Sequence, residues 1–552
     1  MPVYKTPGVY VEEISTLPPS VAEVATAVPA FVGYTEIGPA DGDEPVVARV
    51  TSLLEFKTQF GRAQRMKFKL SVDPAGPTVS PTGGGANFTL YYAISHYFKN
   101  GGGPCYIASV GTYAATPSRD RYIAGLGAIA KEDEPTLLVL TDAATTLAAG
   151  PYYEVCAEAL GQCKALGDRF TILDVHCGKW ADFRSDPSLS GNLMYGAAYH
   201  PYLQTTLAAE YDEADVTLTR PGAKPMPVSG SLTMGGANGL SVAFSGAAGS
   251  TPTVAITAGA KGATPVFAVS GMALTLSDVN AASAADIATA WTTWAASNSP
   301  AGFAVTKLGD GSAVVPATDL AATAIALPAA PVDTLATVKA ANNETALYNA
   351  ARLALDAQRV VLPPSAAVAG VYARVDRDQG VWKAPGNVGV LAVLGPVAKI
   401  TNDEQDRLNV DDTAGKSINA IRAFTGKGTL VWGARTLAGN DNEWRYVSVR
   451  RLFITIEESA RKATAFAVFE ANDATTWLKV KAMIESYLYG LWERGALAGP
   501  KPEAAYYVNV GLGQTMTPQD VLEGRMVVEI GIAAVRPAEF IVLRFSHKLQ
   551  TE

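Results

Sequence analysis

The chain has 552 residues, of which 48% are apolar and 17% are charged, and its formal net charge is −8. At roughly 150 residues per domain, this length predicts about three or four domains with packed cores. The acidic balance argues against nucleic-acid binding, because such binding needs a basic surface that displaces counterions. The 51 glycines and 33 prolines indicate many turns and a strand-rich architecture.

The first predicted element is a short strand at residues 9–14, which follows a turn at Pro7-Gly8. Pro18 and Pro19 prevent the ladder from continuing, because proline lacks the backbone donor. A strand isolated in this way has no partner near it in the sequence. We therefore expect it to pair with a distant strand or with another molecule.

Residues 30–175 alternate strand-like and helix-like segments, a pattern typical of an α/β domain. The predicted strands are 30–35, 105–110, 136–141 and 170–175. The predicted helices are 52–60, which Gly61 closes as a C-cap, 88–100 and 152–166. Between the first two of these helices, the proline- and glycine-rich residues 71–87 are predicted to form a loop.

The composition changes after about residue 215, and from roughly 221 to 330 alanine, glycine, serine and threonine dominate while charges are rare. Alternating runs such as 240–244 and 254–257 indicate short strands, and 278–296 has room for one helix. We expect an inserted, mostly β domain here. Disorder is the alternative, and the regular apolar content argues against it.

Residues 345–358 are predicted to be helical, and the strongest patterning begins at residue 371. A strand at 452–456 is predicted to lead into a helix that ends near Glu470, with Glu457/Arg461 and Glu458/Lys462 spaced as i, i+4 ion pairs. Asp473 is the expected N-cap of a second helix, 474–493, which Gly495 ends. Strand-like runs at 526–535 and 540–545 follow.

An ordered set of motifs runs through residues 1–110 and 371–552. The first part contains Pro7-Gly8-Val9-Tyr10-Val11-Glu12-Glu13, Phe31-Val32-Gly33, Thr51-Ser52 with Phe56, Phe60-Gly61, and Phe98-Lys99-Asn100-Gly101-Gly102 before Cys105-Tyr106. The second part contains Gly380-Val381-Trp382-Lys383-Ala384-Pro385-Gly386-Asn387, Asn419-Ala420-Ile421-Arg422, Val431-Trp432-Gly433-Ala434-Arg435-Thr436, Arg450-Arg451-Leu452, Phe469-Glu470-Ala471-Asn472 with Trp477, Leu491-Trp492, Gly495-Ala496-Leu497, and Pro537-Ala538-Glu539-Phe540-Ile541. In this order they resemble the contractile tail sheath family, shared by contractile-tailed phages, R-type bacteriocins and phage-derived injection systems. The family more often has proline where Ala471 stands, and residues 216–330 match no family segment.

The resemblance implies an α+β (mixed α/β), multidomain fold. The expected parts are an inner sheath domain built from both chain ends, an α/β middle domain and a mostly β inserted outer domain. The implied division is 1–20 as an N-terminal arm with a donated strand, 21–215 with 331–370 as the middle domain, 216–330 as the outer domain, 371–535 as the inner domain, and 536–552 as a C-terminal arm with a donated strand.

The resemblance further implies a structural subunit, not an enzyme, that polymerises as stacked rings around an inner tube. Contraction then drives the tube through a target envelope. The expected partners are other copies of the chain, the tube protein, and baseplate and terminal cap proteins, with no cofactor, nucleic acid or direct membrane insertion. Assembly in the bacterial cytoplasm, into a phage tail (virion) or phage-like particle, is expected. Another structural component of the same machine, such as a baseplate or decoration protein, is the alternative.

Two extended segments are the predicted sheath–sheath contacts, because an extended strand can complete a neighbour's sheet edge. Their residues are Val9, Tyr10, Val11, Glu12, Glu13, Ile14, Phe540, Ile541, Val542, Leu543, Arg544 and Phe545. The tube is expected to be held by polar contacts of modest strength, since the sheath must release it. Lys479 and Lys481 on the 474–493 helix are the predicted tube contacts, and a core helix with a solvated face is the alternative.

Several residues resemble parts of catalytic or ligand-binding sites, but a purely structural role explains each of them. Asp174, His176 and Cys177 end a strand without a second ligand set or a nucleophile elbow, which leaves an α/β enzyme with a β insert as a remote alternative. Residues 426–429 lack the phosphate-loop spacing and predict a turn, and glycines 83–85 predict a flexible loop. Cys105, Cys156, Cys163 and Cys177 form no CxxC pair and are expected to be reduced and mostly buried, and His96, His200 and His547 receive no role. No catalytic residue, metal ligand or cofactor is expected.

Overall fold

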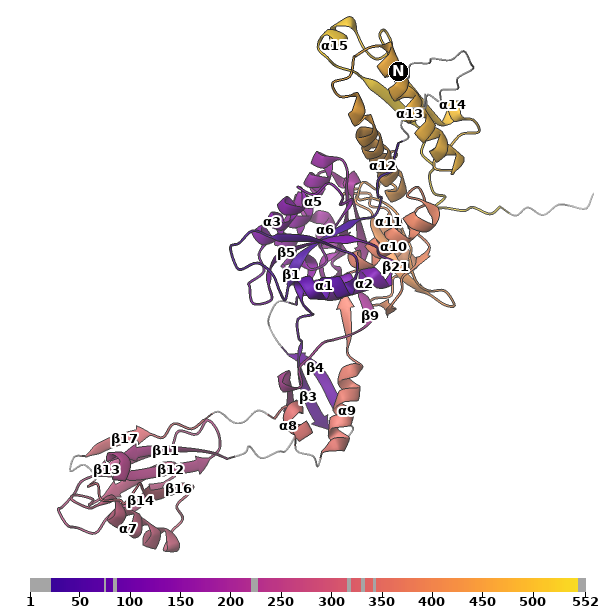
Figure 1. Cartoon of the computed structure of the whole chain (residues 1–552). Coiled ribbons are helices and arrows are strands. Elements are labelled where there is room, and N and C mark those ends of the chain that lie inside the picture. The colour runs from indigo at the N-terminus through magenta and orange to yellow at the C-terminus, as the bar shows by residue number, and fades with distance from the viewer. Residues whose placement is uncertain are drawn as a thin grey trace, which may run out of the picture. The chain divides into compact units, whose positions relative to one another are not determined.

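A computed structural model of the chain describes residues 21–73, 76–82, 87–219, 227–314, 319–328, 333–340 and 344–544. The predicted strand at 9–14 therefore lies outside the described residues, as do Phe545, His547 and the glycines 83–85. The chain separates into two compact units, Met1–Met66 with Gly83–Glu210 and Asp356–Glu552, and Lys67–Thr82 with Tyr211–Leu355. Helices and strands are mixed in both units, so the mixed α/β fold is confirmed (Figure 1).

A nine-stranded sheet, in the order β19-β22-β21-β8-β7-β6-β1-β5-β2, forms the centre of the first unit. Its strands are β1 (Pro29–Thr35), β2 (Val46–Val50), β5 (Cys105–Thr112), β6 (Leu137–Val139), β7 (Phe170–Asp174), β8 (Gly196–His200), β19 (Val388–Gly389), β21 (Ile418–Phe424) and β22 (Gly428–Val431). From β21 to β5 the pairs are parallel, and every residue of β1, β6, β7 and β8 is buried. Helices cover such a sheet on both faces, which explains the continuous apolar runs. Hydrogen bonding thus crosses the predicted boundary at residue 370.

Three helices of this unit lie close to their predicted positions, namely α1 (Leu53–Phe60), α2 (Leu90–Lys99) and α5 (Ala149–Leu166). Five further helices were not predicted, namely α3 (Arg119–Ile129), α4 (Ala143–Thr146), α6 (Trp180–Ser185), α10 (Ser365–Gln379) and α11 (Asn402–Asn409). In α1 the Ser52 side chain accepts from the Glu55 amide, and Gly61 (φ 84°) ends the helix. The buried Asp142 carboxylate joins β1, α2 and α3, because it accepts from the Tyr34 and Thr89 amides and the Tyr122 hydroxyl.

A small three-strand sheet, β18-β9-β20, also belongs to the first unit, with β9 (Leu203–Ala208), β18 (Arg359–Leu362) and β20 (Val393–Pro396). Strands β21 and β22 are joined by a tight turn, in which the Lys427 amide bonds to the Phe424 carbonyl and Gly426 has φ 77°. The turn predicted at 426–429 is therefore confirmed.

The second unit corrects one prediction. Residues 71–87, predicted as a loop, contain most of a hairpin of β3 (Lys67–Asp73) and β4 (Gly76–Thr82), and β10 (Val216–Thr219) pairs with β3. Strand β4 is an edge strand, so Pro77 and Pro81 can lie in it without breaking a ladder on its free side. Helices α8 (Leu335–Ala340) and α9 (Thr345–Asp356) also belong to this unit.

The low-charge insertion is folded and mostly β. One sheet contains β11 (Val228–Met234), β12 (Leu240–Gly246) and β16 (Phe303–Lys307), and the other contains β13 (Thr253–Thr257), β14 (Val266–Ser270), β15 (Ala273–Ser277) and β17 (Leu320–Ala324). Helix α7 (Ala284–Ser297) lies beside them (Figure 1). It begins at Ala284 instead of near 278, because Ser283 and Asp286 form a capping box. Phe244, Trp291 and Phe303 belong to a core drawn entirely from residues 232–327.

The residues after 446 form a lobe around two long helices, α12 (Val447–Ala463) and α13 (Ala474–Glu493). The other elements of this C-terminal lobe are α14 (Pro502–Ala505), α15 (Pro518–Leu522), β23 (Tyr506–Val510) and β24 (Val528–Ile532) (Figure 1). The predicted strand at 452–456 is wrong, since these residues are the middle of α12. The run Leu-Phe-Ile-Thr-Ile favours a strand by composition, but Leu452, Ile456 and Ala460 bury the same helical face, so packing overrides propensity.

Candidate functional site

The two-stranded sheet of the C-terminal lobe is incomplete on one side. Strands β23 and β24 pair with each other alone among the described residues, from Tyr506↔Ile532 to Val510↔Val528. Val508 and Val510 of β23 are buried, whereas Val528 and Ile530 of β24 are only half-buried. A two-stranded sheet is marginal by itself, so this one depends on packing against helices. The apolar side chains of β23 are therefore covered, whereas those of β24 are covered only in part.

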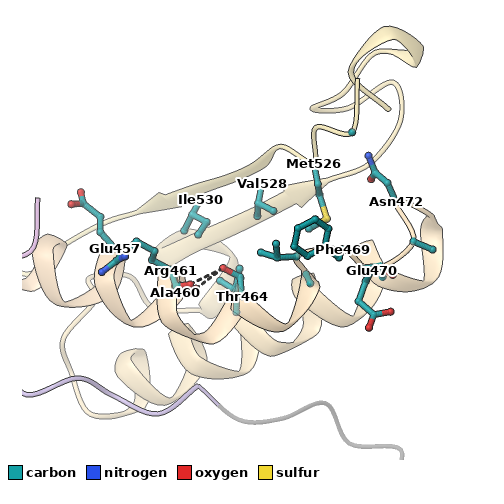
Figure 2. A pocket seen from close by; sticks show the side chains of 16 residues that line it. Glu457, Ala460, Arg461, Thr464, Phe469, Glu470, Asn472, Met526, Val528 and Ile530 are labelled. Atoms are coloured by element: carbon teal, nitrogen blue, oxygen red, sulfur yellow. Dashed lines mark hydrogen bonds between the residues drawn. The ribbon is translucent and has the colours of Figure 1, made fainter. Parts of the chain in front are cut away.

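Beside β24 lies a groove of about 690 Å³, which we call the β24 groove. Its walls are the second half of α12, the turn that follows α12, two residues of α13, and alternate residues of β24 and the segment before it (Figure 2). The main lining side chains are Glu457, Arg461, Phe469, Met526, Val528 and Ile530. In Figure 2, Val528 and Ile530 point from the strand toward the helices. The groove therefore combines an apolar floor with an unpaired strand beside it, the two features that an added strand requires.

The chain itself contains an apolar segment without a place in its own sheets. Phe540, Ile541, Val542 and Leu543 are 70–81% exposed and belong to no helix or strand. The predicted strand at 540–545 is thus absent within the single subunit, over the residues that are described. We call residues 536–552 the C-terminal arm. Consecutive exposed apolar residues of this kind mark an interaction segment.

The base of the C-terminal arm is fixed by Glu539. Its carboxylate accepts from Arg435 Nη2 (2.6 Å), Arg435 Nε (2.9 Å), Asn409 Nδ2 (2.7 Å) and the Tyr446 hydroxyl (3.3 Å). Burial raises the pKa of Glu539, but the hydrogen bonds and the Arg435 charge outweigh burial and hold that pKa below its usual value. Arg435 is itself buried. This clamp determines where the chain leaves the body.

The predicted tube contacts lie on the predicted helix. The Asp473 side chain accepts from the Thr476 amide at the start of α13, as expected, and Val480, Ile484, Leu488 and Leu491 form the buried stripe of this helix. Lys479 is exposed, and Lys481 Nζ lies 3.8 Å from a Glu485 carboxylate oxygen. The structure does not bring the two lysines together with the β24 groove lining. Their contact with a tube stays a prediction.

The polar cluster at 174–177 does not form one site. The buried Asp174 carboxylate accepts from the Ser365 amide (2.8 Å) and hydroxyl (2.5 Å), so it caps the start of α10. His176 Nε2 instead bonds to the Leu147 carbonyl, and Cys177 is exposed. The other three cysteines are buried free thiols, as expected. Among the described residues, no three metal-binding side chains lie together, and no helix there is long and apolar enough to cross a membrane.

The buried acid and the buried histidines predict opposing pH effects. Burial raises the pKa of Asp174 to about 7 despite its hydrogen bonds from Ser365, so the folded chain binds a proton that the unfolded chain lacks, and this group adds stability as pH falls through 7. Burial lowers the pKa of His96 and of His200 to about 4, so the stability from these neutral rings is lost as pH falls from 6.5 toward 4.

We expect the contribution of Asp174 to offset part of the loss at His96 and His200 in the native chain. Asp174→Asn removes the acid contribution alone, so the melting temperature of that variant is expected to match or exceed the parent at pH 8 and to fall more steeply between pH 6.5 and 4.5. Differential scanning calorimetry across this range measures both slopes. Parallel pH profiles for the two proteins would refute the assignment.

Three features of the site were not predicted from the sequence. They are the β24 groove, the Glu539–Arg435 clamp and the exposed Phe469. Each lies in or near a quoted motif, but each depends on residues that are distant from one another in the chain. The predicted i, i+4 pair Glu457/Arg461 is also replaced, because Glu457 pairs with Arg450 and Arg461 pairs with Glu458. One signal in the sequence could have indicated the clamp. It is the carboxylate of Glu539, which stands directly before an apolar run.

Comparisons with known proteins agree with this anatomy. Residues 439–548, which include the C-terminal lobe and part of the arm, match the family described as the phage tail sheath C-terminal domain. The chain is 25% identical over 185 residues to the tail sheath protein of Vibrio phage KVP40, and 26% identical over 180 residues to a putative prophage major tail sheath protein of Pseudomonas aeruginosa. These alignments cover 33% and 32% of this chain and 26% and 44% of the relatives, so the chain spans less than half of either one.

A solved structure matches over nearly the whole length. It is the helical sheath of the anti-feeding prophage in the contracted state, with a TM-score of 0.55 and 26% identity over 99% of this chain and 100% of that one. The likeness therefore extends from the C-terminal lobe to the entire fold.

Proposed function

Because this chain belongs to the contractile tail sheath family, we propose that it is the structural subunit of a contractile sheath. Copies of it polymerise as stacked rings around an inner tube and contract to drive the tube through a target envelope. The subunits are linked by exchanged strands. Baseplate and cap proteins bind the two ends of this assembly, which forms in the bacterial cytoplasm.

One observation carries the strand-exchange part of the proposal: the same lobe presents an open sheet edge with an apolar groove, and the chain presents an unpaired apolar arm. An arm strand beside β24 would give its backbone groups partners and bury its side chains over α12. About five backbone hydrogen bonds at about 1 kcal/mol each contribute roughly 5 kcal/mol before ordering costs. Repeated at every subunit, this linkage holds a polymer together while its domains move.

The charges favour the C-terminal arm of a second copy as the occupant of the groove. The groove lining contains two carboxylates, Glu457 and Glu470, and one cation, Arg461. Outside the lining, Arg450 pairs with Glu457 and Glu458 pairs with Arg461, so these two ion pairs leave the acidic balance of the lining unchanged. The described arm residues 540–544 carry one charge, the cation Arg544. The other predicted donor, residues 9–14, carries two carboxylates and suits a position farther from these side chains.

The clamp at Glu539 gives the arm a fixed origin. A pull on the arm from a neighbouring subunit acts first on a bidentate Arg435–Glu539 pair that is largely buried. The arm therefore transmits force to the segment between β22 and α12, which carries Arg435, and does not simply detach from its own lobe. A fixed point of attachment of this kind suits a subunit that must stay bound to its neighbours during contraction.

Deleting residues 1–20 is expected to leave a folded subunit that cannot form long sheaths, because the N-terminal donated strand is lost. Circular dichroism checks the fold, and negative-stain electron microscopy of the protein co-expressed with its tube checks assembly. The full chain purified in parallel is the control. Long sheaths from the truncated protein would sink the proposal that this segment links subunits.

Replacing residues 227–328 with a short glycine-serine linker is expected to spare assembly, because the core of that region draws no residue from the rest of the chain. The division into arms, middle, inner and outer domains is part of this proposal, with the insertion as the outer domain. The same microscopy is the measurement. Loss of polymer in this variant, with an unchanged melting transition for the remaining chain, would place the insertion within the lattice contacts.

A further inference from the structure

Phe469 is held in an unusual state for a large apolar residue. Its side chain is fully exposed, at 104% of the reference value, and its backbone has φ 68°. A left-handed backbone is disfavoured for every residue with a Cβ, and an exposed aromatic ring gains no packing energy in return. Such strain persists only where the surroundings enforce it, and it is most common at functional positions.

The turn around Phe469 is enforced from both sides. The Val468 amide bonds to the Ala465 carbonyl, and the Glu470 amide bonds to the Ala467 carbonyl. Beyond the turn, Trp477 Nε1 donates to Asn472 Oδ1 (2.7 Å), and Asn472 Nδ2 donates to the Arg525 carbonyl (3.0 Å). These bonds tie the turn to α13 and to the segment before β24. The fold thus holds the backbone at Phe469 in the conformation that exposes the ring.

Phe469 also lines the β24 groove. Figure 2 shows it toward the end of the groove where Met526, Glu470 and Asn472 lie, with Glu457 toward the other end. We propose that Phe469 is an aromatic anchor that packs against the strand donated by a second copy of the chain and fixes its register. This inference rests on the proposed function. The exposed ring would become buried only when that strand, residues 540–544 of the second copy, is in place.

A binding experiment separates the anchor from the groove itself. The acceptor is the full chain with Phe540, Ile541, Val542 and Leu543 replaced by aspartate, so that it cannot donate its own arm. The probe is a fluorescein-labelled peptide of residues 536–548, and anisotropy gives its dissociation constant. Phe469→Ala in the acceptor is expected to weaken binding about 10- to 100-fold, the effect of losing one buried aromatic ring.

Two further acceptor variants sharpen the result. Phe469→Gly relieves the left-handed strain, so it is expected to keep or raise the melting temperature and still to weaken binding as much as alanine does. Leu522→Ala, at a leucine that is 83% exposed in the same lobe but outside the groove lining, is expected to change binding less than 2-fold.

The outcomes are distinguishable. If the peptide binds the parent acceptor and the Phe469→Ala acceptor equally well, the anchor is refuted and strand exchange stands. If the peptide binds no acceptor, even at millimolar concentration, strand donation by this arm and the anchor fall together. If Phe469→Ala weakens co-sedimentation with the tube but not peptide binding, the ring contacts the tube, and the anchor is again refuted.

Discussion

Replacing Phe540, Ile541, Val542 and Leu543 with aspartate is expected to abolish sheath assembly while leaving the melting temperature of the subunit unchanged. These side chains contact little in their own subunit, since each is at least 70% exposed. In an assembled sheath they would be buried against a neighbour, where an unpaired carboxylate costs several kcal/mol. Assembly is measured by sedimentation and negative-stain microscopy, and the fold by calorimetry.

A matched control keeps this result specific. Leu353→Asp with Leu522→Asp changes two leucines that are equally exposed, at 75% and 83%, but lie outside the arm and the β24 groove. This control is expected to assemble. Full-length sheaths from the arm-aspartate protein would contradict the role given to the arm, and a lowered melting temperature would show that the arm packs on its own subunit.

Replacing Arg451 with methionine is expected to destabilise the subunit by roughly 3–5 kcal/mol, the usual effect of removing one partner of a buried ion pair. Arg451 Nη2 lies 2.5 Å from Asp376 and 2.8 Å from the Thr26 carbonyl, and the guanidinium stacks on the Tyr372 ring at 4.7 Å. The two charged side chains are only 3% and 5% exposed. Removing the arginine leaves a buried carboxylate without its partner.

The midpoint of urea unfolding measures the Arg451 effect, with the arm-aspartate background keeping the protein monomeric. Asp376→Leu combined with Arg451→Met is expected to recover most of the loss, since no charge is then left buried alone. Arg377→Met breaks the exposed pair with Asp378 and is expected to cost less than about 1 kcal/mol. If Arg377→Met and Arg451→Met lowered the free energy of unfolding equally, the buried Arg451–Asp376 pair would stabilise the fold no more than an exposed pair does.

Much of the fold could be predicted because local signals and tertiary packing agree over most of the chain. Helix α13 has its cap at Asp473, an apolar stripe and a terminal glycine within one continuous segment, and it was predicted to the residue. Helix α12 was not, because the branched and aromatic residues at 452–456 favour a strand and only burial on nearly every side of the helix selects otherwise. The β3–β4 hairpin was missed because prolines at an edge strand resemble a loop.

The site was less predictable than the fold. The apolar run at 540–543 indicated a strand that completes the sheet edge of a neighbouring copy, and the structure shows the segment exposed in the single subunit. The β24 groove depends on how far a two-stranded sheet covers its helices, which no local pattern encodes. The Glu539–Arg435 clamp joins residues 104 positions apart, and the Asn472 side chain, which follows the Phe469 turn, donates to the Arg525 carbonyl 53 positions away. Contacts between residues so far apart in the sequence can be identified only in the folded structure.

Amide hydrogen exchange of residues 540–544 tests the central claim most directly. In the dilute, unassembled subunit these amides have no partner, and they are expected to exchange within seconds. In the assembled sheath they are expected to exchange at least about 100-fold more slowly, together with new protection of β24, because they would form a ladder with a neighbouring copy. Equally rapid exchange in both states would contradict the account.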